Sequence, residues 1–312
     1  MWTPRCVATD GNHAQACVRM MVPTLLLILA ALITWIVVAG RRAAGRMDVE
    51  YASRYPEGEN GVVGGAEGFV LEGTNGRRLL MFHGSGDSPQ SLRYLAHRLN
   101  AAGYAVCVPL LPGHGRSPQA FAAATATDYH RVALDALLEL EASDGWIGIV
   151  GLSMGGALAA RLCAESTRVR ALVLLAPYLS PPSSVRAARA LSWLWSPLMP
   201  YVSGGGEASV HDPAARAASR AYGSFSGGAL AALVETAEAG RRAVLRLRLP
   251  ILVVNSENDN RIPRALAQAA VDAFTTPVEA HWFDGCGHVI TVDYCKDAVA
   301  DLVLAFLARH AG

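Results

Sequence analysis

The sequence has little lysine and little net charge. Lys296 is the single lysine among 27 basic residues, and 26 acidic residues leave a net charge of +1. A nucleic-acid-binding protein usually has a basic surplus, so we predict no nucleic-acid partner. Because 52% of the residues are hydrophobic and 17% are charged, a disordered chain is also excluded. Codon usage alone explains the preference for arginine.

Cysteine is also scarce. Six cysteines in 312 residues are too few for a disulfide scaffold, and no C-x-x-C pair indicates a zinc site. Cys107, Cys163, Cys286 and Cys295 lie in or beside predicted regular elements, and all four can be free buried thiols. Cys286 and Cys295 flank His288 and would be able to pair if this part of the chain were periplasmic, but their spacing does not decide it.

The sequence has a single long apolar run, over residues 22–40. At about 1.5 Å per residue this run reaches roughly 28 Å, close to the thickness of a bilayer core. We predict a membrane anchor here, preceded by an N-terminal extension at 1–21. A cleaved signal peptide is the alternative, although its apolar region is usually shorter. Arg41, Arg42 and Arg46 follow the run, which places the rest of the chain in the cytoplasm.

Beyond a predicted linker at 41–67, apolar strands alternate with amphipathic helices. The expected strands are Arg78–Phe82, Ala105–Pro109, Trp146–Leu152, Ala171–Ala176, Ile251–Asn255 and Ala280–Phe283. The expected helices are Pro89–Ala102, Asp128–Ala142, Met154–Glu165, Arg264–Phe274 and Asp297–His310. This alternation predicts an α/β fold, a mostly parallel sheet with helices on both faces. The core would comprise 68–177 and 250–312, and 178–249 would form a helical cap insertion.

The most informative motif is G-x-S-x-G at residues 151–155, with Ser153 at its centre. It follows an apolar strand and opens a helical pattern, which is the context of a nucleophile elbow. Gly151 and Gly155 would allow the tight turn that raises the serine above the sheet. The motif predicts Ser153 as the nucleophile.

A serine nucleophile needs a base and an acid, which follow it in chain order. Asp259 and His288 come later, each on a loop just after a predicted strand. Both therefore lie at the same sheet edge as Ser153, where ligands bind in open α/β sheets. Glu257 is the alternative acid, and His281, within a strand, is interpreted as structural.

An oxyanion formed at the serine needs backbone donors. One is the N–H of Met154, directly after the nucleophile. The other is expected from the loop at residues 83–86, where the N–H of Ser85 is the candidate. His83 and Gly84 would shape this loop.

Together these motifs resemble the α/β-hydrolase family. The serine motif, His83-Gly84 and the stretch at 112–117 occur in family order, and residues 287–293 resemble the histidine loop of small-capped bacterial carboxylesterases and monoacylglycerol lipases. The resemblance implies a triad of Ser153, Asp259 and His288, with oxyanion amides at Ser85 and Met154. Such relatives often carry a bulky residue where this chain has Ser85, and the N-terminal anchor is not typical of them.

The cap region carries an aromatic, apolar stretch over residues 191–201. One interpretation is an acyl-chain channel or a lid that faces a membrane. The other is that these side chains attach the cap to the core. The candidate substrate-binding residues are Trp193, Trp195, Leu198 and Met199.

The sequence thus predicts a membrane-anchored serine hydrolase that cleaves carboxylic esters with apolar acyl groups. It requires no metal and no organic cofactor, and its partners are a small-molecule or lipid ester and the membrane through residues 22–40. Thioester or amide hydrolysis and acyl transfer use the same triad and remain alternatives. A non-catalytic, membrane-tethered binding module is the alternative from another class.

Overall fold

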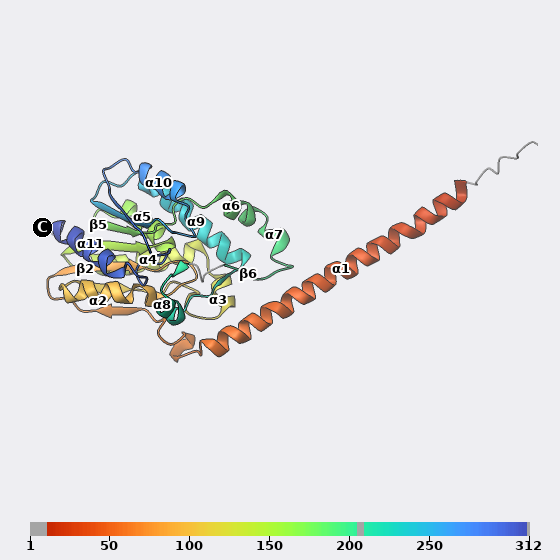
Figure 1. Cartoon of the computed structure of the whole chain (residues 1–312), viewed down its shortest axis with the longest axis horizontal. Coiled ribbons are helices and arrows are strands. Elements are labelled where there is room, and N and C mark those ends of the chain that lie inside the picture. Colours follow the sequence, from red (N-terminus) through yellow and green to blue (C-terminus); the bar gives the residue numbers. More distant parts are fainter. Residues whose placement is uncertain (1–10, 205–208, 311–312) are drawn as a thin grey trace, which may run out of the picture.

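A seven-stranded sheet forms the centre of the computed structural model, which describes residues 11–204 and 209–310 (Figure 1). The strand order is β1-β3-β2-β4-β5-β8-β9, with β1 antiparallel to β3 and all the other pairs parallel. The strands are β1 (Phe69–Leu71), β2 (Arg77–Phe82), β3 (Ala105–Val108), β4 (Trp146–Leu152), β5 (Val169–Leu175), β8 (Ile251–Ser256) and β9 (Glu279–Phe283). All six predicted strands are present, whereas the three-residue β1 was not predicted.

Helices cover both faces of the sheet, as expected. On one face lie α2 (Arg93–Ala101) and α11 (Lys296–Arg309), which pack against Leu79 and Met81 of β2. On the other face lie α4 (Ala126–Glu141), α5 (Met154–Glu165), α9 (Gly227–Val244) and α10 (Arg264–Asp272). They pack against Leu80 and Phe82, because successive side chains of a strand point to opposite faces. The predicted mostly parallel α/β sheet is therefore confirmed.

The segment predicted as a cap, 178–249, contains two different parts. Its short elements lie over the carboxyl edge of the sheet, and its last helix, α9, packs on α5. A Cβ added at Gly240 would lie 2.6 Å from the Cα of Ala157, so the two helices approach closely because α9 has a glycine there. The short elements are α6 (Ser183–Ala190), α7 (Ser192–Trp195), β6 (Val202–Ser203), α8 (Pro213–Ala218) and β7 (Ser224–Phe225). The cap proper therefore ends before α9.

The linker predicted at 41–67 is shorter than expected, because α1 (Gly11–Arg54) continues beyond the apolar run. Residues 41–54 contain no proline and are rich in alanine and arginine, which favour helix. This extension contacts the cap, because the rings of Tyr51 and Tyr222 stack at 4.9 Å. Directly after the helix, the Tyr55 hydroxyl donates to the carbonyl of Ser219. Short helical segments complete the fold: Glu59–Gly61, Pro89–Leu92 and α3 (Pro118–Ala123).

One helix in the described part of the chain is long and apolar enough to cross a membrane. It covers Met21–Arg54, has a mean hydropathy of 2.6 in its most apolar window, and none of that window is buried against the rest of the molecule. Membrane anchors and signal sequences share these properties. The predicted extension at 1–21 lies partly outside the described residues.

Candidate active site

Ser153 lies at the sharp turn between β4 and α5. Its backbone has φ 55° and ψ −118°, a region that L residues rarely adopt, and such strain is typical of functional turns. A Cβ added at Gly151 would lie 2.3 Å from the carbonyl oxygen of Gly155, and one at Gly155 would lie 2.2 Å from that of Phe82. The turn therefore requires glycine at both positions, as the sequence motif predicted.

The structure brings the three predicted triad residues together. The Oγ of Ser153 lies 2.8 Å from Nε2 of His288, and Nδ1 of His288 lies 2.7 Å from Oδ2 of Asp259. A carboxylate only accepts hydrogen bonds, so Nδ1 carries the proton and Nε2 is free to accept the proton of Ser153. Ser153 is 8% exposed and His288 is 7% exposed, which leaves a narrow access for a reacting group.

The Asp259 carboxylate is held in place by its own loop. Its Oδ1 accepts hydrogen bonds from the backbone N–H groups of Arg261 and Ile262, at 2.7 and 2.9 Å. Burial raises the pKa of Asp259, but His288 and these amides outweigh that effect and hold it below its ordinary value. Glu257, the alternative acid, instead pairs with Arg264. The geometry therefore favours Asp259 as the partner of His288.

The loop that follows β2 is fixed by His83. Its Nδ1 donates to the carbonyl of Gly84 at 2.9 Å, and its Nε2 accepts from the backbone N–H of Leu111 at 3.2 Å. Burial lowers the pKa of His83 to about 4, so the ring is neutral and its role is to hold the loop. Ser85 in this loop lines the cavity above Ser153, and Met154 is the first residue of α5. Both predicted oxyanion donors thus belong to backbone that adjoins the serine.

A cavity of about 890 Å³ opens above Ser153 and His288, between the sheet edge and the cap. Of the predicted substrate-binding residues, Trp195 and Met199 line it, whereas Trp193 and Leu198 do not. Trp193 is 73% exposed on the outer side of α7. Met199 follows α7 in a turn, where its N–H donates to the carbonyl of Trp195 at 2.8 Å and so keeps 195 and 199 together. Leu198 instead meets α1, where a Cβ added at Gly40 would lie 1.8 Å from its carbonyl oxygen.

One acidic residue of the cavity was missed by the sequence analysis. Asp87 follows the loop at residues 83–86, lines the cavity and is buried. Burial raises the pKa of its carboxyl to about 6, although hydrogen bonds from Ser91 and the Ser88 amide and the charge of His288 act in the opposite direction. Within the described ranges, none of the ion pairs includes Asp87. Its position directly after a Gly-rich loop was the available signal.

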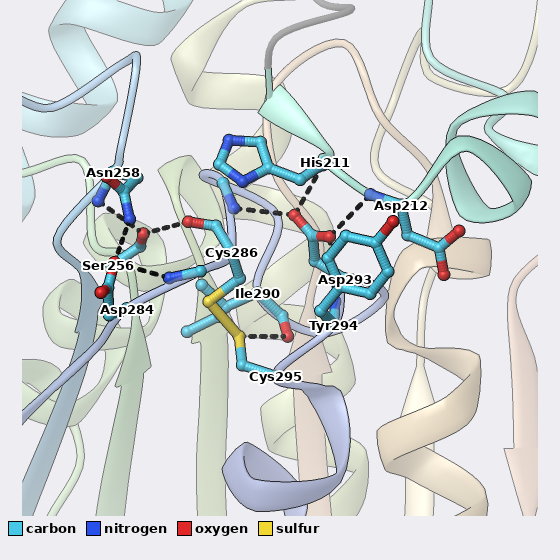
Figure 2. Close-up of a disulfide and its surroundings, with 12 residues drawn as sticks. His211, Asp212, Ser256, Asn258, Asp284, Cys286, Ile290, Asp293, Tyr294 and Cys295 are labelled. Atoms are coloured by element: carbon cyan, nitrogen blue, oxygen red, sulfur yellow. Dashed lines mark hydrogen bonds between the residues drawn. A yellow bond between two sulfur atoms is a disulfide. The ribbon is translucent and has the colours of Figure 1, made fainter.

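Cys286 and Cys295 form a disulfide, with their Cα atoms 5.9 Å apart (Figure 2). The sequence left the state of this pair open, and the structure pairs it. Cys107 and Cys163 are free thiols as expected, but only Cys163 is buried, whereas Cys107 is half-buried. The spacing of nine residues could not show this pairing, because it depends on how the loop folds back before α11. The disulfide closes the loop that carries His288.

Comparisons with known proteins identify the family of the chain. A family model described as serine aminopeptidase, S33 (Hydrolase_4) matches residues 74–294. The chain belongs to this family. Its α/β-hydrolase fold, predicted from the sequence motifs, is thereby confirmed.

Relatives of this family member carry lipolytic names. A thermostable monoacylglycerol lipase of Bacillus sp. (strain H-257) is 26% identical over 269 residues, covering 80% of this chain and 98% of the relative. A carboxylesterase of Bacillus subtilis (strain 168) is 24% identical, covering 77% and 96%. A solved structure from a study of LipS and LipT, two metagenome-derived lipolytic enzymes, has a TM-score of 0.74 and 28% identity, covering 80% of this chain and all of that one. The predicted resemblance to carboxylesterases and monoacylglycerol lipases is confirmed.

Proposed function

We propose that this hydrolase cleaves carboxylic esters with apolar acyl groups through an acyl-enzyme on Ser153. The observation that carries the proposal is the continuous series of contacts from Ser153 through His288 to Asp259, at 2.8 and 2.7 Å. The named relatives, a monoacylglycerol lipase and a carboxylesterase, support an ester as the substrate.

The reaction proceeds in two halves. In the first, Nε2 of His288 takes the proton of Ser153 as Oγ attacks the ester carbonyl, and the amides of Ser85 and Met154 stabilise the oxyanion. Asp259 stabilises the imidazolium, which then gives its proton to the leaving alcohol. In the second half, His288 takes a proton from water as the hydroxide attacks the acyl-enzyme. The carboxylic acid leaves, and Ser153 regains its proton.

The cavity supports an apolar acyl group. Most of its lining is apolar and comes from the cap and α9, including Val185, Trp195, Met199, Leu230 and Leu233. A cavity of about 890 Å³ is within the usual range for sites that enclose a ligand of drug size. A long acyl chain fits such a space, with its carbonyl at Ser153.

The deciding experiment assays the full chain, in detergent or nanodiscs, on p-nitrophenyl esters of two to sixteen carbons and on monoacylglycerols. Ser153→Ala is the control and should lose turnover by about 10³-fold or more. Turnover that persists in this variant would overturn the proposal. A chain-length optimum at the short end would overturn the acyl part alone.

One observation favours amide hydrolysis as a second candidate. The matching family is described as serine aminopeptidase, and the carboxyl of Asp87, which forms no ion pair within the described residues, lines the cavity, where it would bind a substrate ammonium group. Aminoacyl p-nitroanilides test this candidate. Their turnover, lost in Ser153→Ala and weakened in Asp87→Asn, would favour the amide, whereas turnover of esters alone would exclude it.

The N-terminal helix would bring the cap to a membrane. Residues 22–40 form the anchor, whose last residue Gly40 meets Leu198, and the continuation of α1 contacts the cap at Tyr201 and Tyr222 (Figure 1). Exposed apolar side chains lie on this part of the cap, namely Leu191, Trp193, Leu194 and Met199. Brominated phospholipids in nanodiscs should therefore quench the fluorescence of Trp193. The fraction of fluorescence that these lipids quench should be smaller in Trp193→Phe than in the control Trp282→Phe. Equal quenching in the two variants would overturn this orientation.

The Cys286–Cys295 disulfide also bears on the side of the membrane. Disulfides persist in oxidising compartments, so it favours an extracytoplasmic catalytic body, in contrast to the cytoplasmic side expected from Arg41, Arg42 and Arg46. A C-terminal alkaline phosphatase fusion, active only outside the cytoplasm, separates the two orientations. An inactive fusion together with an active C-terminal fluorescent protein would place the body in the cytoplasm.

A further inference from the structure

The carboxylate of Asp293 lies at the junction of the cap and the histidine loop (Figure 2). It is fully buried and accepts four backbone hydrogen bonds. Oδ1 accepts from the N–H groups of Asp212 and Tyr294, both at 2.9 Å. Oδ2 accepts from those of His211 and Gly287, at 2.8 and 2.7 Å. Each oxygen therefore joins one amide of the cap to one amide of the histidine loop.

These four donors replace water around the buried charge. Burial raises the pKa of Asp293, but the amides of His211, Gly287, Asp212 and Tyr294 hold it below the ordinary value. Hydrogen bonds to an ionised group are stronger than neutral ones, so the junction is rigid while Asp293 is charged.

The Gly287 bond is the one that reaches the proposed site. Gly287 directly precedes His288, so its N–H fixes the backbone from which the imidazole projects. On the other side of His288, the N–H of Val289 donates to the carbonyl of Ser209 at 3.0 Å. The histidine is thus held on both sides by contacts that involve the cap segment 209–212.

The same cap segment also reaches the loop of Asp259. The hydroxyl of Ser209 accepts from Nε of Arg261 at 2.8 Å and lies 3.1 Å from Oδ1 of Asn260. One short segment between β6 and α8 therefore supports the loops of both His288 and Asp259. Ser209 and Val210 line the cavity, so this support lies beside the bound substrate.

We propose that Asp293 is a positioning residue for His288, which makes the cap segment 209–212 part of the support of the catalytic base. The inference rests on the proposed function, in which His288 is that base. Asp293 does not touch the reacting atoms. It holds Nε2 of His288 at the distance from Ser153 that proton transfer requires.

The first test is Asp293→Asn in the full chain. The asparagine amide would direct an NH₂ group toward two backbone N–H donors, so two of the four bonds are lost and replaced by repulsion. Misplacing a catalytic group by about 1 Å costs about 100-fold in rate, so we expect kcat to fall by about that factor while KM changes less than about twofold. Asp284→Asn is the matched control, since Asp284 is an exposed carboxylate at the start of the same loop and accepts from Gly285. It should keep wild-type kcat.

The second test removes a single donor and keeps Asp293. Asp212 has φ −64°, which proline adopts without strain, so Asp212→Pro deletes the N–H that donates to Asp293. Asp212→Ala is its control, because both variants lose the aspartate side chain that caps α8 and only the proline variant loses the N–H. We expect kcat of the proline variant to be about tenfold lower than that of the alanine variant.

A readout without substrate distinguishes failure of this inference from failure of the proposed function. We expect the proton on Nδ1 of His288, bonded to Asp259 at 2.7 Å, to give a far-downfield resonance in the wild type. The inference predicts that this resonance is lost or shifted in Asp293→Asn and retained in Asp284→Asn, while both variants remain folded at the assay temperature. If the wild type hydrolyses no ester, the resonance still decides the role of Asp293.

Two results would overturn the inference. One is an unchanged resonance, with kcat of Asp293→Asn within twofold of the wild type. The other is a loss of activity that matches the unfolded fraction and disappears on cooling, because that pattern marks a structural role only. If Asp293→Asn does not fold, the Asp212→Pro and Asp212→Ala pair decides, and equal kcat in that pair would refute the role.

Discussion

The Oγ of Ser153 and the Nε2 of His288 lie 2.8 Å apart, although 135 positions separate the two residues in the chain. They meet because β4 and β9 run parallel in one sheet, so the loops after both strands open at the same edge. Asp259 reaches the same edge after β8, and the proposed acid, base and nucleophile therefore come from three strand ends.

We expect Asp259→Asn to abolish most turnover while the fold is retained. The asparagine can orient its NH₂ toward Nδ1, which favours the tautomer in which Nε2 carries the proton and cannot accept that of Ser153. A loss of about 10⁴-fold in kcat is expected from this change. Steady-state assays on a p-nitrophenyl ester, with circular dichroism as the check on folding, measure it.

Glu257→Gln is the matched control for that experiment. Glu257 lies two positions before Asp259 and pairs with Arg264 at the surface. It should keep activity within about twofold, because an exposed ion pair contributes little. A large loss in Glu257→Gln with little loss in Asp259→Asn would reverse the assignment of the acid.

The sequence was most informative where a pattern repeats or marks the end of a strand. Apolar runs identified the six parallel strands, and chain order then predicted the triad of Ser153, Asp259 and His288, which the structure brings together. The sequence did not show which side chains of the cap face the cavity. The same apolar stretch contains Trp195, which lines the cavity, and Trp193, which is turned outward. Only the position of α7 against the core separates the two.

Two carboxylates were beyond the reach of sequence patterns for a different reason. Two of the four amides that Asp293 binds, those of His211 and Asp212, lie 82 and 81 positions away in the chain. The raised pKa of Asp87 depends on its burial in the folded protein. Backbone donors from distant residues leave no local signature, and the Gly-rich loop before Asp87 marks its place in the chain but not its burial. The extension of α1 to Arg54 was missed because the apolar run ends at Gly40 while helix propensity continues.

Asp87 should give the stability of the protein an unusual dependence on pH. Its pKa is raised to about 6 in the folded state, so between about pH 4 and pH 6 the folded state binds more protons than the unfolded state. The contribution of Asp87 to the free energy of unfolding therefore decreases as pH rises through this window and is constant above it. Asparagine does not ionise, so Asp87→Asn avoids this decrease in the free energy of unfolding. The variant should therefore be more stable than the wild type at pH 8 by about 2–3 kcal/mol.

Urea titrations of the wild type and Asp87→Asn across pH 4 to 8 test this dependence. The pKa values of Asp259 and Asp293 are lowered in the folded state, so their contributions to the free energy of unfolding decrease as pH falls, opposite to that of Asp87. Both residues are present in the wild type and in Asp87→Asn, so the difference between the two proteins cancels their effect. A difference between the proteins that stays constant over the whole range would contradict a raised pKa.

Ala188→Trp should shorten the preferred acyl chain. Ala188 lies on α6 and lines the cavity, so an indole there occupies the space of several methylene groups. Each buried methylene is worth about 0.8 kcal/mol, and the loss of a few should reduce kcat/KM for long esters by roughly 10- to 100-fold. Short esters should be hydrolysed at nearly the wild-type rate.

The neighbouring Ala187 provides the control, because it is exposed on the same helix and does not line the cavity. Ala187→Trp should leave the chain-length profile of p-nitrophenyl esters unchanged. If both variants shift the profile equally, the cap itself has moved, and the size of the cavity does not determine the preferred acyl length.

The Cys286–Cys295 disulfide should stabilise the folded protein by about 2–3 kcal/mol, because it closes a loop across a separation of nine residues and so restricts the unfolded chain. The double variant Cys286→Ser/Cys295→Ser should unfold at a correspondingly lower urea concentration. Reductant should lower the midpoint of the wild type toward that of the variant and leave the variant unchanged. A wild-type midpoint that does not respond to reductant under denaturing conditions would show that the cysteines are not paired, and the case for an oxidising compartment would fail with it.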